Sequence, residues 1–231
     1  MNSIWKNISC NLPLNHKNKI EGRKLLSYLN SDTIKVCFFD PQYRGVLDKL
    51  SYGNEGKQRG KQRSELTQMS FEIIEEFLNE IERVLVPSGY LFLWVDKFHL
   101  VEGIKSWFKN DSKLNCVDMI TWDKEKIGMG YRTRRKSEYL VVIQKEPKLA
   151  KATWILHDIP DVWQEKVKKE HPHSKPIELQ TKLIEATCKQ GDFILDPAAG
   201  GYSVLKCAQN MNIDFIGGDI EFGEEIKNAN V

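Results

Sequence analysis

The chain has 231 residues, of which 41% are hydrophobic and 29% charged, with a formal net charge of +2. This composition excludes a disordered or fibrous protein and is sufficient for one domain with a substantial core. The apolar stretch at 90–95 is too short to span a bilayer, and the N-terminus lacks the apolar run of a secretory signal. Five scattered cysteines without C-x-x-C spacing predict neither a disulfide framework nor a zinc site. We therefore expect a soluble cytoplasmic protein that forms a single domain over residues 1–231.

The first half of the chain alternates between strand and helix patterns. β-branched and aromatic residues at 34–39 predict a buried strand that ends in Asp40-Pro41. A polar, basic stretch at about 44–68 shows no periodicity, which is typical of a functional or mobile loop. Apolar residues at helical spacing over 71–85, with Ser70 as the N-cap, predict an amphipathic helix that Pro87-Ser88-Gly89 ends. A strand at 90–95, a helix at about 100–109 and strands at about 117–122 and 138–143 follow.

The second half is more clearly punctuated. A helix at about 177–188 ends before Gly191, which has the expected terminating position. A strand at 193–195, a glycine-containing turn at 196–201, a helix at about 203–209 and a strand at 214–217 follow. The segment 148–170 has few periodic positions and is predicted to be an insertion rather than part of a sheet. The alternation predicts an α/β fold, Rossmann-like and doubly wound, with a mainly parallel sheet.

The glycine-containing turn is the first candidate site. Gly200 and Gly201 follow a strand, where they allow close approach of the backbone to a ligand. Asp219 follows the next strand, about twenty residues later, where nucleotide-binding folds place a ribose-binding carboxylate. The full G-x-G-x-x-G pattern is absent. An ordinary turn has the same composition, so this pattern alone leaves a nucleoside site and a turn as equal alternatives.

The second candidate site is Asp40-Pro41-Gln42-Tyr43 at the end of the first predicted strand. Asp40 supplies a hydrogen-bond acceptor for an amino group, and Tyr43 supplies a flat face on which a base can stack. An enzyme that holds a flipped base needs both features. By itself, however, D-P-x-Y is also a turn signal.

Taken together, these residues resemble the beta group of S-adenosylmethionine-dependent DNA amino-methyltransferases, whose hallmark is D-P-P-Y or S-P-P-Y. The early Asp40-Pro-Gln-Tyr43 and the late Asp196-Pro-Ala-Ala-Gly-Gly201 have the permuted order of that group. Between them, Ile120-Thr-Trp-Asp-Lys124 resembles the Trp-x-Lys strand of the family, and His171-Pro-His-Ser-Lys-Pro176 resembles its H-P-x-x-K-P motif. The resemblance extends from about residue 20 to 222. It implies the class I methyltransferase fold with circularly permuted motif order.

The resemblance also implies roles for individual residues. Asp40 and the Pro41 carbonyl would hold the target amine while Tyr43 stacks on the base. The candidate cofactor-binding residues are Asp40, His171, Lys175, Asp196, Ala198, Gly200, Gly201 and Asp219. Three positions depart from the family pattern. Gln42 replaces a proline, which is expected to loosen the Pro41 carbonyl that the family directs at the target amine. Ala198 replaces an aromatic residue and Tyr202 a glycine, so the cofactor pocket is expected to be reshaped.

Two basic clusters are candidates for contacts with the phosphate backbone of double-stranded DNA. One comprises Lys57, Arg59, Lys61 and Arg63, and the other comprises Arg132, Arg134, Arg135 and Lys136. Solvated surface loops can have the same composition. Sequence recognition is assigned to the insertion at 148–170, in which Trp154 and Trp163 are expected to pack rather than stack on bases.

Several functional alternatives stay open. Asp at position 40 favours adenine N6 over cytosine N4 as the target, and methylation of RNA adenines is a related alternative. A nicotinamide-dependent oxidoreductase and a non-catalytic DNA-binding module belong to different classes. No metal is expected, because His171 and His173 lack a third ligand. The family resemblance implies a restriction-modification role with a cognate endonuclease. It is also compatible with a homodimer.

Overall fold

The computed structural model describes residues 12–42, 69–128, 132–167 and 174–226. The strands within them are β1 (Asn18–Lys19), β2 (Ile34–Phe39), β3 (Leu85–Val95), β4 (Leu114–Asp123), β5 (Ser137–Lys145), β6 (Val162–Gln164), β7 (Phe193–Asp196), β8 (Asp214–Asp219) and β9 (Glu224–Glu225). The helices are α1 (Gly22–Ser27), α3 (Phe71–Val84), α4 (Lys97–Glu102), the 3₁₀ helix η3 (Ile104–Trp107), α5 (Ala150–Thr153), α6 (Ile177–Thr187) and α7 (Ser203–Asn210).

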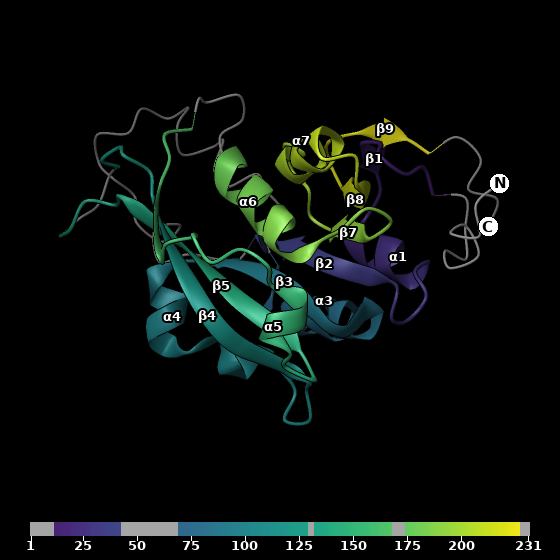
Figure 1. Ribbon diagram of the computed structural model, residues 1–231, viewed down its shortest axis with the longest axis horizontal. Helices are drawn as coiled ribbons and strands as arrows, with labels where there is room; N and C mark the ends of the chain where they lie inside the picture. Colours follow the sequence, from purple (N-terminus) through teal and green to yellow (C-terminus); the bar gives the residue numbers. More distant parts are fainter. Residues whose placement is uncertain (1–11, 43–68, 129–131, 168–173, 227–231) are drawn as a thin grey trace.

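The strands form one sheet in the order β6-β4-β5-β3-β2-β7-β8-β1-β9 (Figure 1). Among these strands only β5 runs antiparallel to its neighbours, β3 and β4. Helices α1 and α3 pack on one face of the sheet, and α6 and α7 pack on the other. The predicted α/β fold with a doubly wound, mainly parallel sheet is therefore confirmed.

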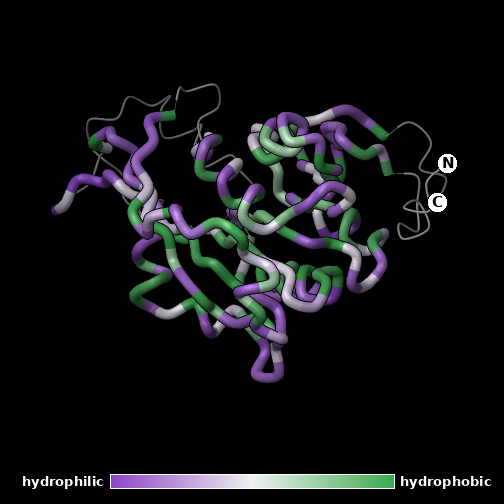
Figure 2. The backbone as a smooth tube through the Cα atoms, in the orientation of Figure 1, coloured by the Kyte–Doolittle hydropathy of each residue, from purple (hydrophilic) through white to green (hydrophobic). Residues whose placement is uncertain are grey.

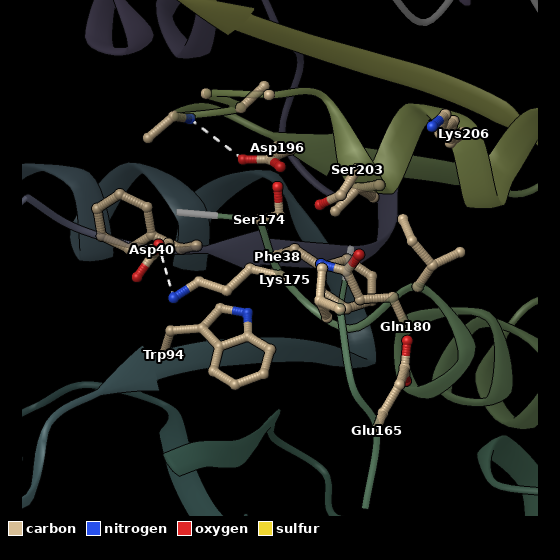
Figure 3. A pocket seen from close by; sticks show the side chains of 18 of the residues that line it. Phe38, Asp40, Trp94, Glu165, Ser174, Lys175, Gln180, Asp196, Ser203 and Lys206 are labelled. Atoms are coloured by element: carbon tan, nitrogen blue, oxygen red, sulfur yellow. Dashed lines mark hydrogen bonds and ion pairs between the residues drawn. The ribbon is translucent and has the colours of Figure 1, made fainter. Parts of the chain in front are cut away.

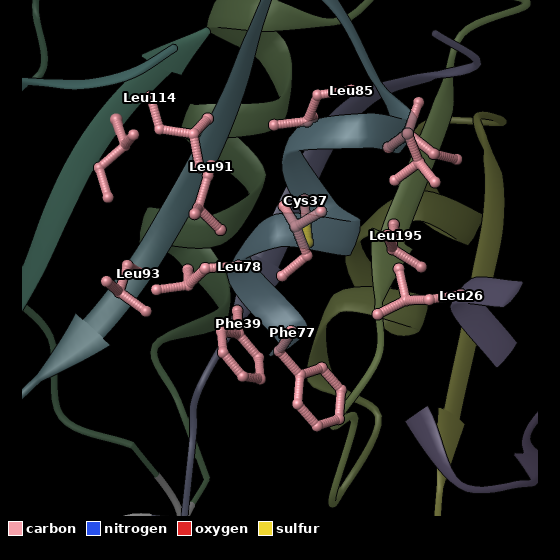
Figure 4. Close-up of a cluster of buried hydrophobic side chains, with 14 of the residues drawn as sticks. Leu26, Cys37, Phe39, Phe77, Leu78, Leu85, Leu91, Leu93, Leu114 and Leu195 are labelled. Carbon is pink, nitrogen blue, oxygen red and sulfur yellow. The ribbon is translucent and has the colours of Figure 1, made fainter. Parts of the chain in front are cut away.

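Two apolar layers hold the helices against the sheet. Hydrophobic residues follow the central strands, whereas the outer turns are mostly hydrophilic (Figure 2). On the α3 side, Phe39 stacks on Phe77 with ring centroids 5.0 Å apart, among buried leucines of β3 and α3 (Figure 4). On the opposite side, Leu179 and Leu183 of α6 are fully buried against the strands. Burial on both faces explains why β2 and β3 read as continuous apolar runs rather than as alternating patterns.

The sheet changes winding direction between β2 and β7. From β2 the chain passes through α3 to β3 on one side, and from β7 it passes through α7 to β8 on the other. The two strands are parallel neighbours, with Val36 opposite Ile194 and Cys37 opposite Leu195. In open α/β sheets, ligands bind at such a switch point, outside the carboxyl ends of the strands.

The predicted amphipathic helix is confirmed, but its end was placed too late. Ser70 is the N-cap, and its side chain accepts a hydrogen bond from the Ile73 amide. The helix ends at Val84, and the next strand begins at once with Leu85, so Pro87 lies inside β3. The pairing of β2 with β3 has a register irregularity there, which is where a sheet tolerates a residue without an amide proton.

Two other predictions are corrected. The helix expected at about 100–109 is split into α4 and η3, because Gly103 between them adopts a φ of +89°. The segment 148–170, predicted to lie outside the sheet, contributes the edge strand β6, which pairs in parallel with β4. In the same segment Trp154 packs edge-on against Tyr90 and Phe92. This agrees with the expectation that it packs.

Tyr202 occupies the position at which the family pattern has glycine, and it adopts a left-handed backbone with a φ of +58°. Its side chain is buried on the side of β1 and β8, and its hydroxyl lies 2.7 Å from the Asn18 carbonyl oxygen and 3.1 Å from that of Phe222. The aromatic residue therefore anchors the short N-terminal strand β1, which the sequence patterns did not predict.

We expect Tyr202→Phe to lower the free energy of unfolding by about 1–2 kcal/mol, because the variant loses the hydroxyl that donates to the carbonyl of the buried Asn18. Chemical denaturation monitored by tryptophan fluorescence measures this change. Tyr202→Ala, which also removes the ring, should cost about 3–5 kcal/mol. Equal stability of Tyr202→Phe and the wild type would show that the hydroxyl contacts do not contribute.

Candidate active site at the carboxyl ends of β2 and β7

A cavity of about 460 Å³ opens at the switch point between β2 and β7. This volume lies within the range of small-molecule sites, about 300–1,000 Å³. Its walls come from the ends of β2, β3 and β7, from the segment before α6 and from the start of α7 (Figure 3). Lining residues include Phe38, Asp40, Gln42, Trp94, Glu165, Ser174, Lys175, Gln180, Asp196, Ala198, Gly200, Gly201 and Ser203.

Asp40 follows β2 directly and forms an ion pair inside this cavity. Its Oδ2 lies 2.9 Å from the Nζ of Lys175 (Figure 3). The same ammonium lies 3.0 Å from Glu138 Oε2 and 4.7 Å from the centroid of the Trp94 ring. Within the described part of the chain, Oδ1 of Asp40 has no hydrogen-bond partner. One carboxylate oxygen is therefore held while the other is available to a ligand.

The glycine-containing turn after β7 is held by two aspartates. The Ala198 amide donates to Asp196 Oδ1 at 3.3 Å, and the Gly200 amide donates to Asp219 Oδ2 at 3.0 Å. Asp219 Oδ1 also accepts hydrogen bonds from the Glu221 and Phe222 amides. Asp219 therefore ties the turn to the end of β8.

Asp196 is the most electrostatically perturbed group of the cavity. Its side chain is buried, and burial raises the pKa of the carboxyl to about 8, with the nearby carboxylates of Asp40 and Asp219 acting in the same direction. The Ala198 amide and Lys175 oppose this increase only in part. A ligand that brings a cation to Asp196 would remove the cost of charging it.

Trp94 contributes a donor that sequence reasoning missed. Its side chain is 2% exposed, and its indole Nε1 is the only buried side-chain nitrogen or oxygen of the described residues without a hydrogen-bond partner. The residue also lines the cavity. Because Trp94 lies in a continuous apolar strand, its sequence context is that of an ordinary core aromatic.

These features fit a nucleoside cofactor that carries an amino-acid group. Gly200 lines the cavity with a φ of +47°, and a Cβ added there would meet no protein atom within 4 Å, so the space beside the turn is open. Asp196 lacks a dedicated cation and Trp94 Nε1 lacks an acceptor. An occupant with both an ammonium and a carboxylate is complementary to this pair.

The structure brings most of the predicted site residues together. Asp40, Lys175, Asp196, Ala198, Gly200 and Gly201 line the cavity, and Asp219 is hydrogen-bonded to its rim. Tyr43, His171 and the cluster of Lys57, Arg59, Lys61 and Arg63 lie outside the described residues. Gln42 is not loosely held, because its carbonyl accepts a hydrogen bond from the Met69 amide at 2.7 Å.

The second basic cluster lies in the connection from β4 to β5. Arg132 and Arg134 are exposed, whereas Arg135 is less exposed and lies 5.8 Å from the centroid of the Phe98 ring. Because Tyr139 of β5 is opposite Val95 of β3, this connection leaves the sheet at the edge where Asp40 is located. Two of the three arginines are thus accessible on the side of the cavity.

The model of the DNA methylase family N6_N4_Mtase matches residues 34–231. The Type II methyltransferase M.HhaII of Haemophilus parahaemolyticus is 65% identical over 213 residues, which cover 92% of this chain and 93% of that protein. The chain belongs to this family of DNA methyltransferases. A more distant relative is the Type II methyltransferase M2.DpnII of Streptococcus pneumoniae, 27% identical over 90% of this chain and 88% of that protein.

Solved structures of low sequence identity share the fold. The M1.HpyAVI–SAM complex superposes with a TM-score of 0.62 at 15% identity, covering 89% of this chain and 93% of that one. The cytosine-N4-specific PvuII DNA methyltransferase superposes with a TM-score of 0.62 at 13% identity, covering 87% and 80%. These likenesses confirm the class I methyltransferase fold.

Membership of the family confirms the resemblance and the expected S-adenosylmethionine cofactor, and it decides against the nicotinamide-dependent oxidoreductase. The enzyme is a Type II DNA methyltransferase, and its substrate is DNA. In the described ranges, no helix is sufficiently long and apolar to cross a membrane.

The perturbed carboxyl of Asp196 predicts a pH dependence of stability. Its pKa in the folded protein, about 8, lies above its ordinary value of 3.8, so the folded state retains a proton that the unfolded state releases. Stability of the cofactor-free protein should therefore fall as the pH rises between these two values. Relative to Asp196→Asn, the wild type should lose more than about 1 kcal/mol over this range.

Denaturant titrations of both proteins at several pH values measure this difference, and other titrating groups cancel in the comparison. If the two stability profiles were parallel, Asp196 would not be perturbed in the free enzyme.

Proposed function

We propose that the protein is a site-specific DNA methyltransferase that transfers a methyl group to N6 of a flipped adenine. The observation that carries this proposal is the position of Asp40 in the cavity, with Oδ2 held by Lys175 and Oδ1 available. Asp rather than Ser at this position supports adenine as the target. The exocyclic amines adenine N6 and cytosine N4 have similar chemistry. Methylation of cytosine N4 is therefore the alternative outcome of the test below.

An exocyclic amine is a poor nucleophile because its lone pair is delocalised into the ring. Hydrogen bonds from the amine to Asp40 and to the Pro41 carbonyl favour a tetrahedral nitrogen, in which the lone pair is localised. S-adenosylmethionine supplies the electrophilic methyl group on its sulfonium. Catalysis by the chain then consists of holding the amine in line and stabilising the positive charge that develops on nitrogen.

The turn after β7 provides the proposed cofactor site. Open space lies beside Gly200, and Gly201 lines the same cavity. Asp219 at the end of β8 would bind the ribose hydroxyls through the lone pairs that its backbone amide contacts leave. Asp196 is suited to the ammonium of the methionine part because its carboxyl is buried without a dedicated cation. His171 stays a predicted neighbour of the same group.

For DNA, we assign Arg132 and Arg134 to the phosphate backbone because both are exposed on the cavity side. The lysines and arginines at 57–63 and Tyr43 stay predicted contacts, as does target recognition by the segment 148–170. The family resemblance also supports a cognate restriction endonuclease as a partner. Whether the chain forms a homodimer is tested by size-exclusion chromatography with light scattering.

We expect Asp40→Ala to lower the rate of methyl transfer by about 100-fold or more, because the amine loses its charged acceptor. The assay measures incorporation of labelled methyl from S-adenosylmethionine into unmethylated bacterial genomic DNA and identifies the modified nucleoside after digestion. N6-methyladenine made by the wild type supports the proposal. N4-methylcytosine would instead show that cytosine N4 is the target.

The matched control is Asp32→Ala, which removes the partner of Lys145 far from the cavity. This variant should retain the wild-type rate. Calorimetry of Asp40→Ala with S-adenosylmethionine measures the cofactor contact that the sequence also predicts for Asp40, and the loss of rate at saturating cofactor should exceed the loss of affinity. An Asp40→Ala variant as active as the wild type would contradict the assigned mechanism, and a wild type that binds cofactor and DNA without transferring methyl would indicate a non-catalytic module.

A further inference from the structure

A row of four charges of alternating sign crosses the carboxyl edge of the sheet. It begins at Asp40, passes to Lys175 at 2.9 Å and on to Glu138 at 3.0 Å, and ends at Lys124, whose Nζ lies 3.0 Å from Glu138 Oε1. The four residues come from the end of β2, the segment before α6, the start of β5 and the segment after β4. Residues that are distant in sequence therefore form one electrostatic unit.

Lys175 is the central member of this row. Its side chain is 14% exposed, and its ammonium is covered by the face of Trp94. An ammonium in such a place is stable only if carboxylates compensate its lost hydration. Asp40 and Glu138 together do so and raise the pKa of Lys175 despite its burial. Among the described residues, its ammonium contacts Asp40, Glu138 and the Trp94 ring, and its charge also acts at longer range on Asp196. These contacts favour a positioning role over direct binding of the cofactor.

The contact also fixes the orientation of Asp40. A carboxylate at a strand end can rotate, but the ion pair between Oδ2 and Lys175 directs Oδ1 to the remaining free space. Because the proposed reaction needs an acceptor at a defined position, a misplaced Oδ1 lowers the rate even when the substrate is bound.

The role that we assign to Glu138 is to keep the net charge beside the target amine negative. Transfer of a methyl group to a neutral amine creates a positive charge on nitrogen, and a neighbouring negative charge stabilises it. Lys175 alone would neutralise Asp40. With Glu138 added, the group Asp40–Lys175–Glu138 carries one net negative charge. Lys124 contacts Glu138 on the far side and is more exposed than Lys175, so solvent screens it more strongly.

Glu138 is held in its charged form near neutral pH. Burial acts to raise its pKa, but the ammonium groups of Lys175 and Lys124 outweigh this effect and hold the pKa at about 2. The residue therefore acts as a permanent anion and not as an acid or a base.

We propose that Lys175 and Glu138 are positioning residues of the methyl-transfer reaction. Lys175 orients the Asp40 carboxylate, and Glu138 restores the net negative charge that the target amine needs during transfer. This inference rests on the proposed role of Asp40 and assigns to Lys175 a task other than the cofactor contact expected from the sequence.

The first test is Glu138→Gln, which keeps the shape and an oxygen acceptor for Lys175 but removes the charge. We expect the single-turnover rate of methyl transfer to fall by about tenfold or more, with the dissociation constants for S-adenosylmethionine and DNA within about twofold of the wild type. The matched control is Asp118→Asn, which removes an exposed carboxylate of β4 whose side chain accepts a hydrogen bond from the Met119 amide. It should retain the wild-type rate.

The second test is Lys175→Met. Without the ammonium, Asp40 and Glu138 become neighbouring carboxylates that disfavour each other's ionisation. We therefore expect the residual rate, measured with saturating S-adenosylmethionine, to rise with pH between about 5 and 8. The rise should be steeper than in Lys175→Arg and the wild type, in which Asp196 titrates but the ammonium or guanidinium compensates both carboxylates. Glu138→Gln combined with Lys175→Met should remove this additional pH dependence, which a purely structural defect would not do.

The outcomes separate this inference from the proposed function. A loss of cofactor affinity by Lys175→Met that is as large as its loss of rate would overturn the positioning role and make Lys175 a cofactor ligand. Wild-type rates for Glu138→Gln, together with an inactive Asp40→Ala, would refute only the present inference. An active Asp40→Ala would refute the proposed function on which it rests.

Discussion

Parallel pairing of β2 with β7 is the constraint on which the site depends. The two strands are adjacent in the sheet and lie at opposite ends of the sequence, and their register places the residues that follow Phe39 and Leu195 at the same edge. The other lining residues, from β3, the segment before α6 and the start of α7, surround the ends of these two strands. The chain winds away from this pair of strands in both directions, and the cavity lies at the point where the two directions part.

Charge compensation then determines which chemistry the crevice supports. Three carboxyl groups, Asp40, Asp196 and Asp219, converge on a partly buried space, and each is stabilised differently. Asp219 accepts hydrogen bonds from three backbone amides and Asp40 pairs with Lys175, whereas the Ala198 amide and the more remote charge of Lys175 offset the burial of Asp196 only in part. In the proposed function these unequal partners give Asp219 the turn and the ribose, orient Asp40 toward the target amine and leave Asp196 suited to a cation. A single residue type thereby acquires three tasks from its surroundings.

The departures from the family pattern find physical explanations in the packing. Tyr202 replaces a glycine yet adopts the same left-handed backbone, and its ring points away from the cavity to secure β1. At the position of the missing proline, the Gln42 carbonyl accepts a hydrogen bond from the Met69 amide. Ala198 lines the cavity with a small side chain, so that position enlarges the pocket. None of these positions disrupts the turn between β7 and α7.

The sequence by itself determined the strands at 34–39 and 193–195, the helix capped by Ser70, the two motif sites and their permuted order. These features are encoded locally, by apolar periodicity, caps and turn residues that operate within a few positions of one another. Only the tertiary structure decided that Lys175 pairs with Asp40, that Glu138 joins them, and that the indole of Trp94 is an unpaired donor in the cavity. Such contacts join residues far apart in the chain, and local patterns carry no information about them because long-range pairing depends on sheet order and register.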